Sequence, residues 1–306
     1  MAVNIPTFKL STGLTIPAVG YGCGTKWYGA AKDETGLDRA LVNSMVEAIK
    51  LGYRHIDGAE MYGNEAEIGA AIKESGVPRD QLFITTKLFP SVKDPKARFV
   101  ESLKNLGVDY IDLYLLHCPF FDKQSHGVSV GEVWEAIEAL HDNGKGPART
   151  IGVSNFLVPD LEELMKTAKI TPAVNQIEIH PYCFDEALYK YCNDNNILLT
   201  AYGPLSATVR FAGGPLDAVL EKIGQKYGKT KEQVQIKWGL EMGWVVVTTT
   251  QKKERMVLYG DMEGWNLEKE EVEEIKKVGL SKPQRAFWDG KYKFVQGEGW
   301  KRVDKE

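Results

Sequence analysis

The 306-residue sequence predicts a (β/α)8 TIM barrel, and three observations carry this prediction. Eight short apolar runs recur at fairly regular intervals, and each of them closes on a polar or small residue. Helix-like segments lie between most of the runs, and alternating strand and helix signals are typical of parallel βαβ units. The length suits one such barrel, which usually takes about 250 residues plus insertions. We therefore expect a single α/β barrel domain over residues 1–306.

The predicted strands end in polar side chains. In chain order the strands cover residues 18–22, 53–57, 82–87, 111–117, 150–155, 173–178, 197–203 and 244–249. Their ends carry Asp57, Lys87, His117, Ser154, Asn155, Gln176 and Tyr202. Because such a barrel builds its active site at the C-terminal ends of its strands, these residues should meet at one mouth. The set combines proton-handling groups with polar groups that can hold a ligand.

Apolar residues at helical spacing predict the segments between the strands. The pattern covers residues 37–51, 130–140, 216–227 and 267–278. A capping box from Thr230 to Gln233 opens a further helix.

The two ends of the chain carry their own signals. Residues 8–17 predict a small hairpin with Gly13 in its turn, placed to plug the bottom of the barrel. Residues 281–306 show no periodicity but hold five aromatic residues, which implies that they pack on something. They pack either on the outer helices or over the active-site mouth. The predicted fold takes them as a C-terminal substrate loop.

Composition is typical of a soluble enzyme. The hydrophobic content of 43% is enough for a sizeable core, and the net charge of −4 provides no basic footprint for nucleic acid. No apolar stretch approaches the roughly 18 residues of a membrane span, and the N-terminus shows no signal-peptide pattern. The four cysteines form no CxxC pair, so we interpret them as reduced thiols. We expect a cytoplasmic monomer with no membrane or nucleic-acid partner.

A glycine cluster after the first strand does not predict a dinucleotide fingerprint. Gly20, Gly22 and Gly24 are spaced GxGxG rather than GxGxxG, and no clear helix opens behind them. We interpret the segment as a tight loop that exposes Trp27.

Four residues on consecutive units have a joint chemical use. Tyr62 follows the strand that ends at Asp57, and Lys87 and His117 end the next two strands. A free phenol titrates near pKa 10, and a nearby ammonium lowers that value. A carboxylate would keep the lysine charged, and a histidine would bind a substrate oxygen. Each residue alone is often structural, but the four together favour catalysis.

The sequence gives less support to two other kinds of active site. Cys118 and His117 could suggest a nucleophile pair, but adjacent strand residues point to opposite faces. His55 and Asp57 could suggest a metal-dependent hydrolase. With five histidines in the chain we find no convincing set of metal ligands, and we expect no metal.

These residues lie in motifs that resemble the aldo-keto reductase superfamily. The matching segments are GYRHIDGAEMYGNE at 52–65, TK at 86–87, LHCP at 116–119, IGVSNF at 151–156 and NQIE at 175–178. Their order and spacing agree from about residue 8 to 280. The resemblance implies a catalytic tetrad of Asp57, Tyr62, Lys87 and His117, with Tyr62 as the proton donor. The implied reaction is hydride transfer from NADPH to a carbonyl carbon.

The resemblance also implies a cofactor site. Ser154, Asn155 and Gln176 would hold the nicotinamide carboxamide, and Tyr202 would stack on its ring. The remaining positions implied for the cofactor are Gly203, Leu205, Thr249, Thr250, Lys252 and Arg255. Lys252 is either a phosphate partner or a solvated helix start, and both interpretations stay open.

Several positions depart from the family pattern. Gly203 replaces a common serine, which could weaken a pyrophosphate contact, and Thr249 replaces a lysine that commonly binds the 2′-phosphate. Arg255 keeps its place relative to the family pattern, so we still predict a preference for NADPH. These departures, with residues 117–121 and 285–287, resemble the fungal branch of conjugated-polyketone and ketopantoyl-lactone reductases.

The substrate prediction rests on aromatic residues after strand ends. We expect the pocket to be lined by Trp27, Phe89, Cys118, Phe121 and Trp288. Cys118 stands where many sugar-reducing relatives carry a tryptophan, so that wall should be lower. The sequence therefore predicts reduction of α-dicarbonyls, conjugated polyketones or α-keto lactones. The alternatives are a general aldose or aldehyde reductase and a non-catalytic nicotinamide-binding regulatory subunit.

Overall fold

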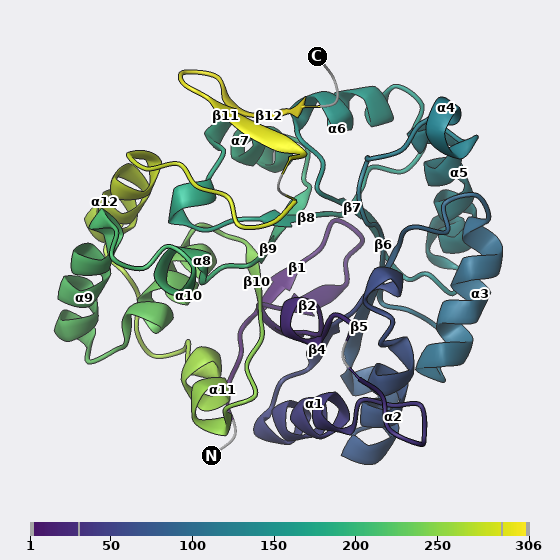
Figure 1. Ribbon diagram of the computed structural model, residues 1–306, viewed down its shortest axis with the longest axis horizontal. Coiled ribbons are helices and arrows are strands. Elements are labelled where there is room, and N and C mark those ends of the chain that lie inside the picture. The colour runs from purple at the N-terminus through teal and green to yellow at the C-terminus, as the bar shows by residue number, and fades with distance from the viewer. Residues whose placement is uncertain (1–2, 30, 289, 304–306) are drawn as a thin grey trace.

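Eight parallel strands close into a barrel in the computed structural model, which describes residues 3–29, 31–288 and 290–303 (Figure 1). The barrel strands are β3 (Val19–Gly22), β4 (His55–Asp57), β5 (Phe83–Leu88), β6 (Leu113–Leu116), β7 (Ile151–Ser154), β8 (Val174–Glu178), β9 (Leu198–Tyr202) and β10 (Val245–Thr248). Strand β10 pairs with β3 and closes the ring, with Val246 opposite Val19. The predicted barrel is confirmed, and only β5 extends beyond its predicted run, by one residue.

Helices surround the barrel. The longer ones are α1 (Arg39–Leu51), α2 (Glu65–Ser75), α3 (Pro95–Leu106), α5 (Val130–His141), α6 (Val158–Met165), α7 (Glu186–Asp194), α9 (Pro215–Tyr227), α10 (Lys231–Glu241), α11 (Lys253–Gly260) and α12 (Lys269–Leu280). Short turns of helix are α4 (Lys123–His126), α8 (Ser206–Val209), η1 (Thr25–Trp27), η2 (Glu60–Tyr62), η3 (Arg79–Gln81), η4 (Asp142–Gly144) and η5 (Pro181–Cys183). The capping box predicted at Thr230 opens α10, since its side chain accepts the N–H of Gln233.

An N-terminal hairpin closes one end of the barrel. Its strands β1 (Thr7–Lys9) and β2 (Thr15–Pro17) pair antiparallel, and Gly13 in the turn adopts φ 88°. Leu10 and Ile16 from this hairpin pack among side chains from inside the barrel, including Phe83 and Val245. The predicted plug is therefore confirmed, and the opposite end, where the strands terminate, remains open for a site.

The C-terminal segment packs across that open end. It returns from α12 and forms the hairpin of β11 (Tyr292–Val295) and β12 (Gly299–Arg302) (Figure 1). Both placements that the sequence left open are observed: Phe287 and Trp288 line the cavity described below, and Arg302 of β12 bonds Asp160 of α6.

Two predictions from composition concern the cysteines and membrane-spanning helices. The four cysteines are buried and free. Among the helices of the described chain, none has the length and apolar character needed to cross a membrane.

Candidate active site

A cavity of about 550 Å³ opens at the C-terminal ends of the strands. The strand-end residues that line it are Gly22, Asp57, His117, Ser154, Asn155, Gln176, Tyr202, Val247 and Thr248. Tyr62 joins them from η2, the short turn that follows β4. Of the seven strand-end residues expected at one mouth, all but Lys87 line this cavity.

Lys87 lies beneath the cavity, where it is fully buried and paired. Its Nζ donates hydrogen bonds to Oδ1 of Asp57 at 2.5 Å and to the carbonyl oxygen of Gly58 at 2.7 Å. The same nitrogen lies 5.1 Å from the centre of the Tyr62 ring. The Tyr62 ring in turn meets the His117 ring edge to face, with centres 5.6 Å apart. The four residues of the predicted tetrad therefore form one cluster.

Burial and a neighbouring ammonium act on the pKa of Tyr62 in opposite directions. Burial raises the pKa of Tyr62 above its ordinary value, and the nearby Lys87 ammonium offsets only part of that shift. Burial and the charge of Lys87 hold the pKa of His117 well below its ordinary value. Tyr62 is therefore a protonated phenol and His117 a neutral imidazole at neutral pH. The predicted effect of Lys87, a lowering of the Tyr62 pKa, is present, but burial outweighs it and the pKa as a whole is raised.

A second polar cluster borders the first. Ser154 donates its hydroxyl to the carbonyl oxygen of Gln176 at 2.7 Å, and Tyr202 donates to Oδ1 of Asn155 at 2.6 Å. Nδ2 of Asn155 donates to the carbonyl oxygen of His117 at 2.9 Å. These bonds hold the residues predicted for the nicotinamide in fixed positions.

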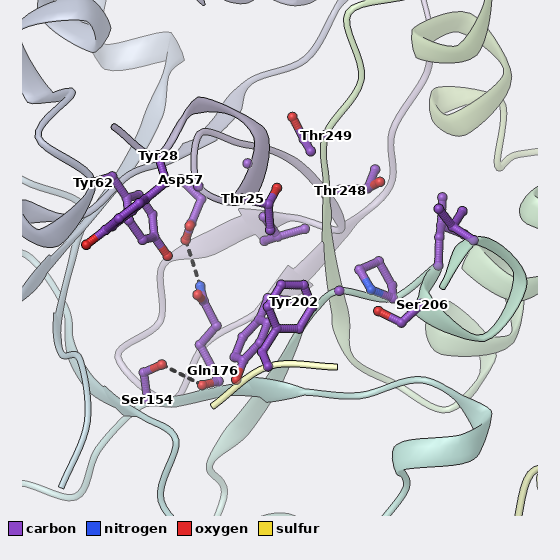
Figure 2. A pocket seen from close by; sticks show the side chains of 18 of the residues that line it. Thr25, Tyr28, Asp57, Tyr62, Ser154, Gln176, Tyr202, Ser206, Thr248 and Thr249 are labelled. Carbon is purple, nitrogen blue, oxygen red and sulfur yellow. Dashed lines mark hydrogen bonds between the residues drawn. The ribbon is translucent and has the colours of Figure 1, made fainter. Parts of the chain in front are cut away.

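The two clusters are joined by a contact that the sequence does not reveal. Nε2 of Gln176 donates to Oδ2 of Asp57 at 2.6 Å (Figure 2). Since Asp57 also holds Lys87, the predicted nicotinamide set and the predicted proton-transfer set share one carboxylate. In Figure 2 Tyr62 lies on one side of this bond and Tyr202 on the other.

Two arginines border the cavity without a carboxylate partner in the described part of the chain. Arg255 comes from α11, and Arg210 follows α8. Arg210 packs over the ring of Phe287 at 4.6 Å. The hydroxyl of Thr249, which also lines the cavity, is buried and has no hydrogen-bond partner among the described residues. These groups can serve an anionic, phosphate-bearing cofactor.

Two residues predicted for the cofactor lie outside this lining. The hydroxyl of Thr250 accepts the backbone N–H of Lys252 at 3.1 Å, and its carbonyl oxygen accepts the Tyr21 hydroxyl at 3.3 Å. Lys252 is exposed at the residue before α11. The solvated helix start is thus the interpretation that the structure favours. Gly203 and Leu205 line the cavity as expected, and so do Pro204, Ser206 and Tyr259, which were not predicted as site residues.

The predicted substrate wall needs the largest correction. Of its five residues only Trp288 lines the cavity. Trp27 is 4% exposed and belongs to the core, because η1 turns its ring inward and presents its neighbour Tyr28 to the mouth. Cys118 follows His117 on the opposite face of the chain and is fully buried.

Phe89 and Phe121 also lie away from the cavity. Both rings pack near His126, at 6.4 Å and 5.8 Å between ring centres. The observed wall instead consists of Tyr28, Met61, Phe287 and Trp288. The aromatic character predicted for the mouth is kept, but different residues provide it.

One cluster outside the cavity has metal-ligating atoms. Glu178, His180 and Cys183 place their ligand atoms within 4.8 Å of one another, and all three residues are buried. Arg285 lies 3.6 Å from Glu178, and burial raises the pKa of the Cys183 thiol. A neighbouring guanidinium and a protonated thiol both disfavour a cation at this position.

Comparison with known proteins agrees with the fold and the clusters. Residues 21–279 match the model of the Aldo/keto reductase family. The chain is 41% identical over 279 residues to the NAD/NADP-dependent indole-3-acetaldehyde reductase of Schizosaccharomyces pombe, covering 90% of this chain and 96% of that protein. It is 37% identical over 310 residues to the NADPH-dependent alpha-keto amide reductase of Saccharomyces cerevisiae, covering 96% and 99%.

A solved structure shares the same architecture. The aldo-keto reductase of Bombyx mori in complex with NADP matches with a TM-score of 0.80 and 33% identity, over 90% of this chain and 94% of that chain. The chain therefore belongs to the aldo/keto reductase family and is an oxidoreductase. The fungal origin of both relatives agrees with the resemblance to a fungal branch.

Proposed function

We propose that this chain reduces α-dicarbonyl compounds, with cyclic or conjugated diketones and α-keto lactones as its favoured substrates. It is an NADPH-dependent reductase of carbonyl compounds by its family. The observation that carries the substrate proposal is the composition of the cavity wall. The wall of Tyr28, Met61, Phe287 and Trp288 beside Tyr62 and His117 has no carboxylate or carboxamide. The cavity's own carboxylate and carboxamides, on Asp57, Gln176 and Asn155, are bonded within the two polar clusters.

Such a wall favours flat, electrophilic substrates over sugars. An apolar pocket cannot hydrogen-bond a row of hydroxyl groups, so it gains little affinity for a polyol. A vicinal dicarbonyl is a stronger electrophile, and its compact planar form suits aromatic walls. One relative is named as an alpha-keto amide reductase, and an α-keto amide is also a vicinal dicarbonyl compound.

The cofactor would lie along the cavity, from the cluster that holds Asn155 and Gln176 to the two arginines, Arg210 and Arg255. When bound, NADPH supplies the hydride to the carbonyl carbon. Ser154, Asn155 and Gln176 would hold its carboxamide, and Tyr202 its ring. Arg255 would pair with the 2′-phosphate and Arg210 with the pyrophosphate, which fits two guanidinium groups that have no carboxylate partner in the described chain.

The proton would come from Tyr62. Its phenol is kept protonated by burial, so the proton is present at neutral pH. As negative charge develops on the carbonyl oxygen, that oxygen becomes basic enough to take the proton. The Lys87 ammonium then stabilises the phenolate that is left, because it lies 5.1 Å from the ring centre. Neutral His117 would donate a hydrogen bond to the same oxygen.

A substrate panel tests this function. Purified protein should oxidise NADPH with higher kcat/KM for cyclic α-diketones and α-keto lactones than for xylose or glucose. A panel in which the aldoses exceed the dicarbonyls would overturn the substrate proposal and favour a general aldose reductase. NADPH binding without turnover of any carbonyl compound would favour a regulatory subunit.

A further inference from the structure

The carboxylate of Glu178, the last residue of β8, is fully buried against the C-terminal segment. Its Oε1 accepts a hydrogen bond from the backbone N–H of Ala286 at 2.6 Å and another from Nε2 of His180 at 3.0 Å. Its Oε2 accepts the backbone N–H of Phe287 at 3.0 Å. One buried charge therefore ties the barrel to the segment that leads from α12 to β11.

Arg285 balances this charge from the same segment. Its Nε lies 3.6 Å from Oε2 of Glu178, and its guanidinium packs over the rings of Tyr292 at 4.0 Å and Trp300 at 5.2 Å. A buried ion pair that loses one partner leaves an uncompensated charge behind. The contact is therefore specific for a carboxylate at position 178.

A second anchor follows the wall residues in the chain. The hydroxyl of Tyr292 donates to the carbonyl oxygen of Asn155 at 2.6 Å. Nη1 of Arg302 donates to the carbonyl oxygen of Pro119 at 3.1 Å and to Oδ1 of Asp160 at 3.0 Å. The chain between Phe287 and Tyr292 is thus held to the barrel at both ends.

Trp288 lies between these anchors in a strained conformation. Its φ of 57° falls in the left-handed region, which bulky residues rarely adopt unless the surrounding structure enforces it. Its ring centre lies 6.0 Å from that of His117 and 4.9 Å from that of Phe120. Local preference does not account for this placement, so the anchors must set it.

We propose that Glu178 is a positioning residue for substrate specificity. By holding the backbone of Ala286 and Phe287 at the end of β8, its carboxylate fixes the wall that meets bulky substrates. Glu178 does not line the cavity and touches neither of the predicted reacting groups, Tyr62 and His117. The proposal rests on the carbonyl reduction proposed above, but its first test needs no substrate.

Hydrogen exchange of the wild-type protein provides that test. The backbone N–H groups of Ala286 and Phe287 should be protected to a degree similar to those of the barrel strands, because a buried carboxylate accepts them. Exchange as fast as that of an exposed loop would overturn the proposal, whatever the enzyme reduces.

Glu178→Gln then tests the consequence. The amide retains the size of the side chain but replaces one acceptor oxygen with a donor that faces an N–H group. We expect the two backbone amides to exchange about tenfold faster or more, as suits the loss of hydrogen bonds to a charged group. KM for phenanthrenequinone, a bulky planar diketone, should rise about tenfold. The kcat for the small diketone butanedione and the Kd for NADPH should change little, and Glu178→Asp should restore part of the lost affinity.

Glu186→Gln is a matched control, because Glu186 is an exposed carboxylate at the start of α7 and pairs with Lys276 at 3.7 Å. It should change none of these quantities. In a Trp288→Ala background, Glu178→Gln should raise the bulky diketone's KM less than about twofold, since the ring it positions is gone. Equal increases in both backgrounds, or equal losses for bulky and small diketones, would overturn the positioning role of Glu178. A wild-type protein that reduces no carbonyl would refute the proposed function but leave the exchange result intact.

Discussion

The ring of Phe287 lies where a side chain at position 203 would have to be. A Cβ built on Gly203 would come within 2.6 Å of Cε2 of Phe287, and Gly203 itself adopts φ 60°. Phe287 also meets the Tyr202 ring edge to face, with centres 5.6 Å apart. The absence of a side chain at Gly203 therefore leaves room for the C-terminal wall.

Replacing this glycine should displace the wall. We expect Gly203→Ser to lower the free energy of unfolding by about 1–3 kcal/mol, because overpacking adds to the left-handed backbone. Urea unfolding measures the change. Gly213→Ala is the control, since Gly213 also has a positive φ, 81°, but nothing lies within 4 Å of its Cβ position. Equal losses in the two variants would mean that Phe287 moves aside without cost.

Tyr62→Phe should remove the proton donor and leave the cavity intact. General acid catalysis is typically worth about 10²–10⁴-fold, so kcat for reduction should fall by at least that range. Fluorescence titration should show NADPH binding close to that of wild type. Tyr28→Phe removes a hydroxyl from the same cavity and should retain most activity. Near-normal turnover by Tyr62→Phe would exclude the assigned role.

Lys87→Met should change the pH dependence as well as the rate. Burial raises the pKa of Tyr62 and Lys87 lowers it, so removing the ammonium leaves burial unopposed and the pKa rises further. Reduction at neutral pH should drop severely, and the rise of alcohol oxidation with pH, which follows formation of the phenolate, should move to higher pH. Profiles of kcat from pH 6 to about 10 measure this shift, and circular dichroism checks that the barrel remains folded. Superimposable profiles would refute the coupling.

The two arginines of the cavity should affect the two cofactors differently. Arg255→Ala should weaken binding of NADPH far more than that of NADH, because only NADPH carries the 2′-phosphate. Arg210→Ala should weaken both cofactors to a similar extent, since both carry the pyrophosphate. Titrations of each variant with each cofactor give the four ratios. A wild-type preference for NADH, or equal losses in Arg255→Ala, would remove Arg255 from the phosphate site.

Buried histidines should make the protein less stable in mild acid. Burial lowers the pKa of His55 to about 4, and the pKa values of His117 and His180 are also lowered, chiefly by burial. The unfolded chain therefore binds protons near pH 6.5 that the folded chain does not. Below that pH each histidine should reduce the free energy of unfolding by up to about 1.4 kcal/mol per pH unit. Urea unfolding at pH 7 and 5.5 measures the slope, and a flat profile would contradict the burial of these rings.

Much of the fold and the polar site could be predicted from the sequence alone. Strand positions follow from short apolar runs that the barrel buries on both faces, and successive side chains along a strand alternate between those faces. For this reason the residue pattern was enough to place Asp57, His117 and Gln176 around one mouth, with Lys87 bonded to Asp57. The predicted tetrad, apart from Tyr62 on η2, and the predicted carboxamide set depend on this regular geometry.

The walls of the cavity were decided by tertiary structure. In an irregular loop no period determines which neighbour faces inward, and core packing buried Trp27 and left Tyr28 at the mouth. The bond from Gln176 to Asp57 joins residues 119 apart, and Glu178 reaches Phe287 over 109 residues. The sequence determined which chemistry the strand ends carry, because backbone periodicity is local. Only the closed barrel decided which aromatic rings surround that chemistry, because their positions depend on contacts between distant segments.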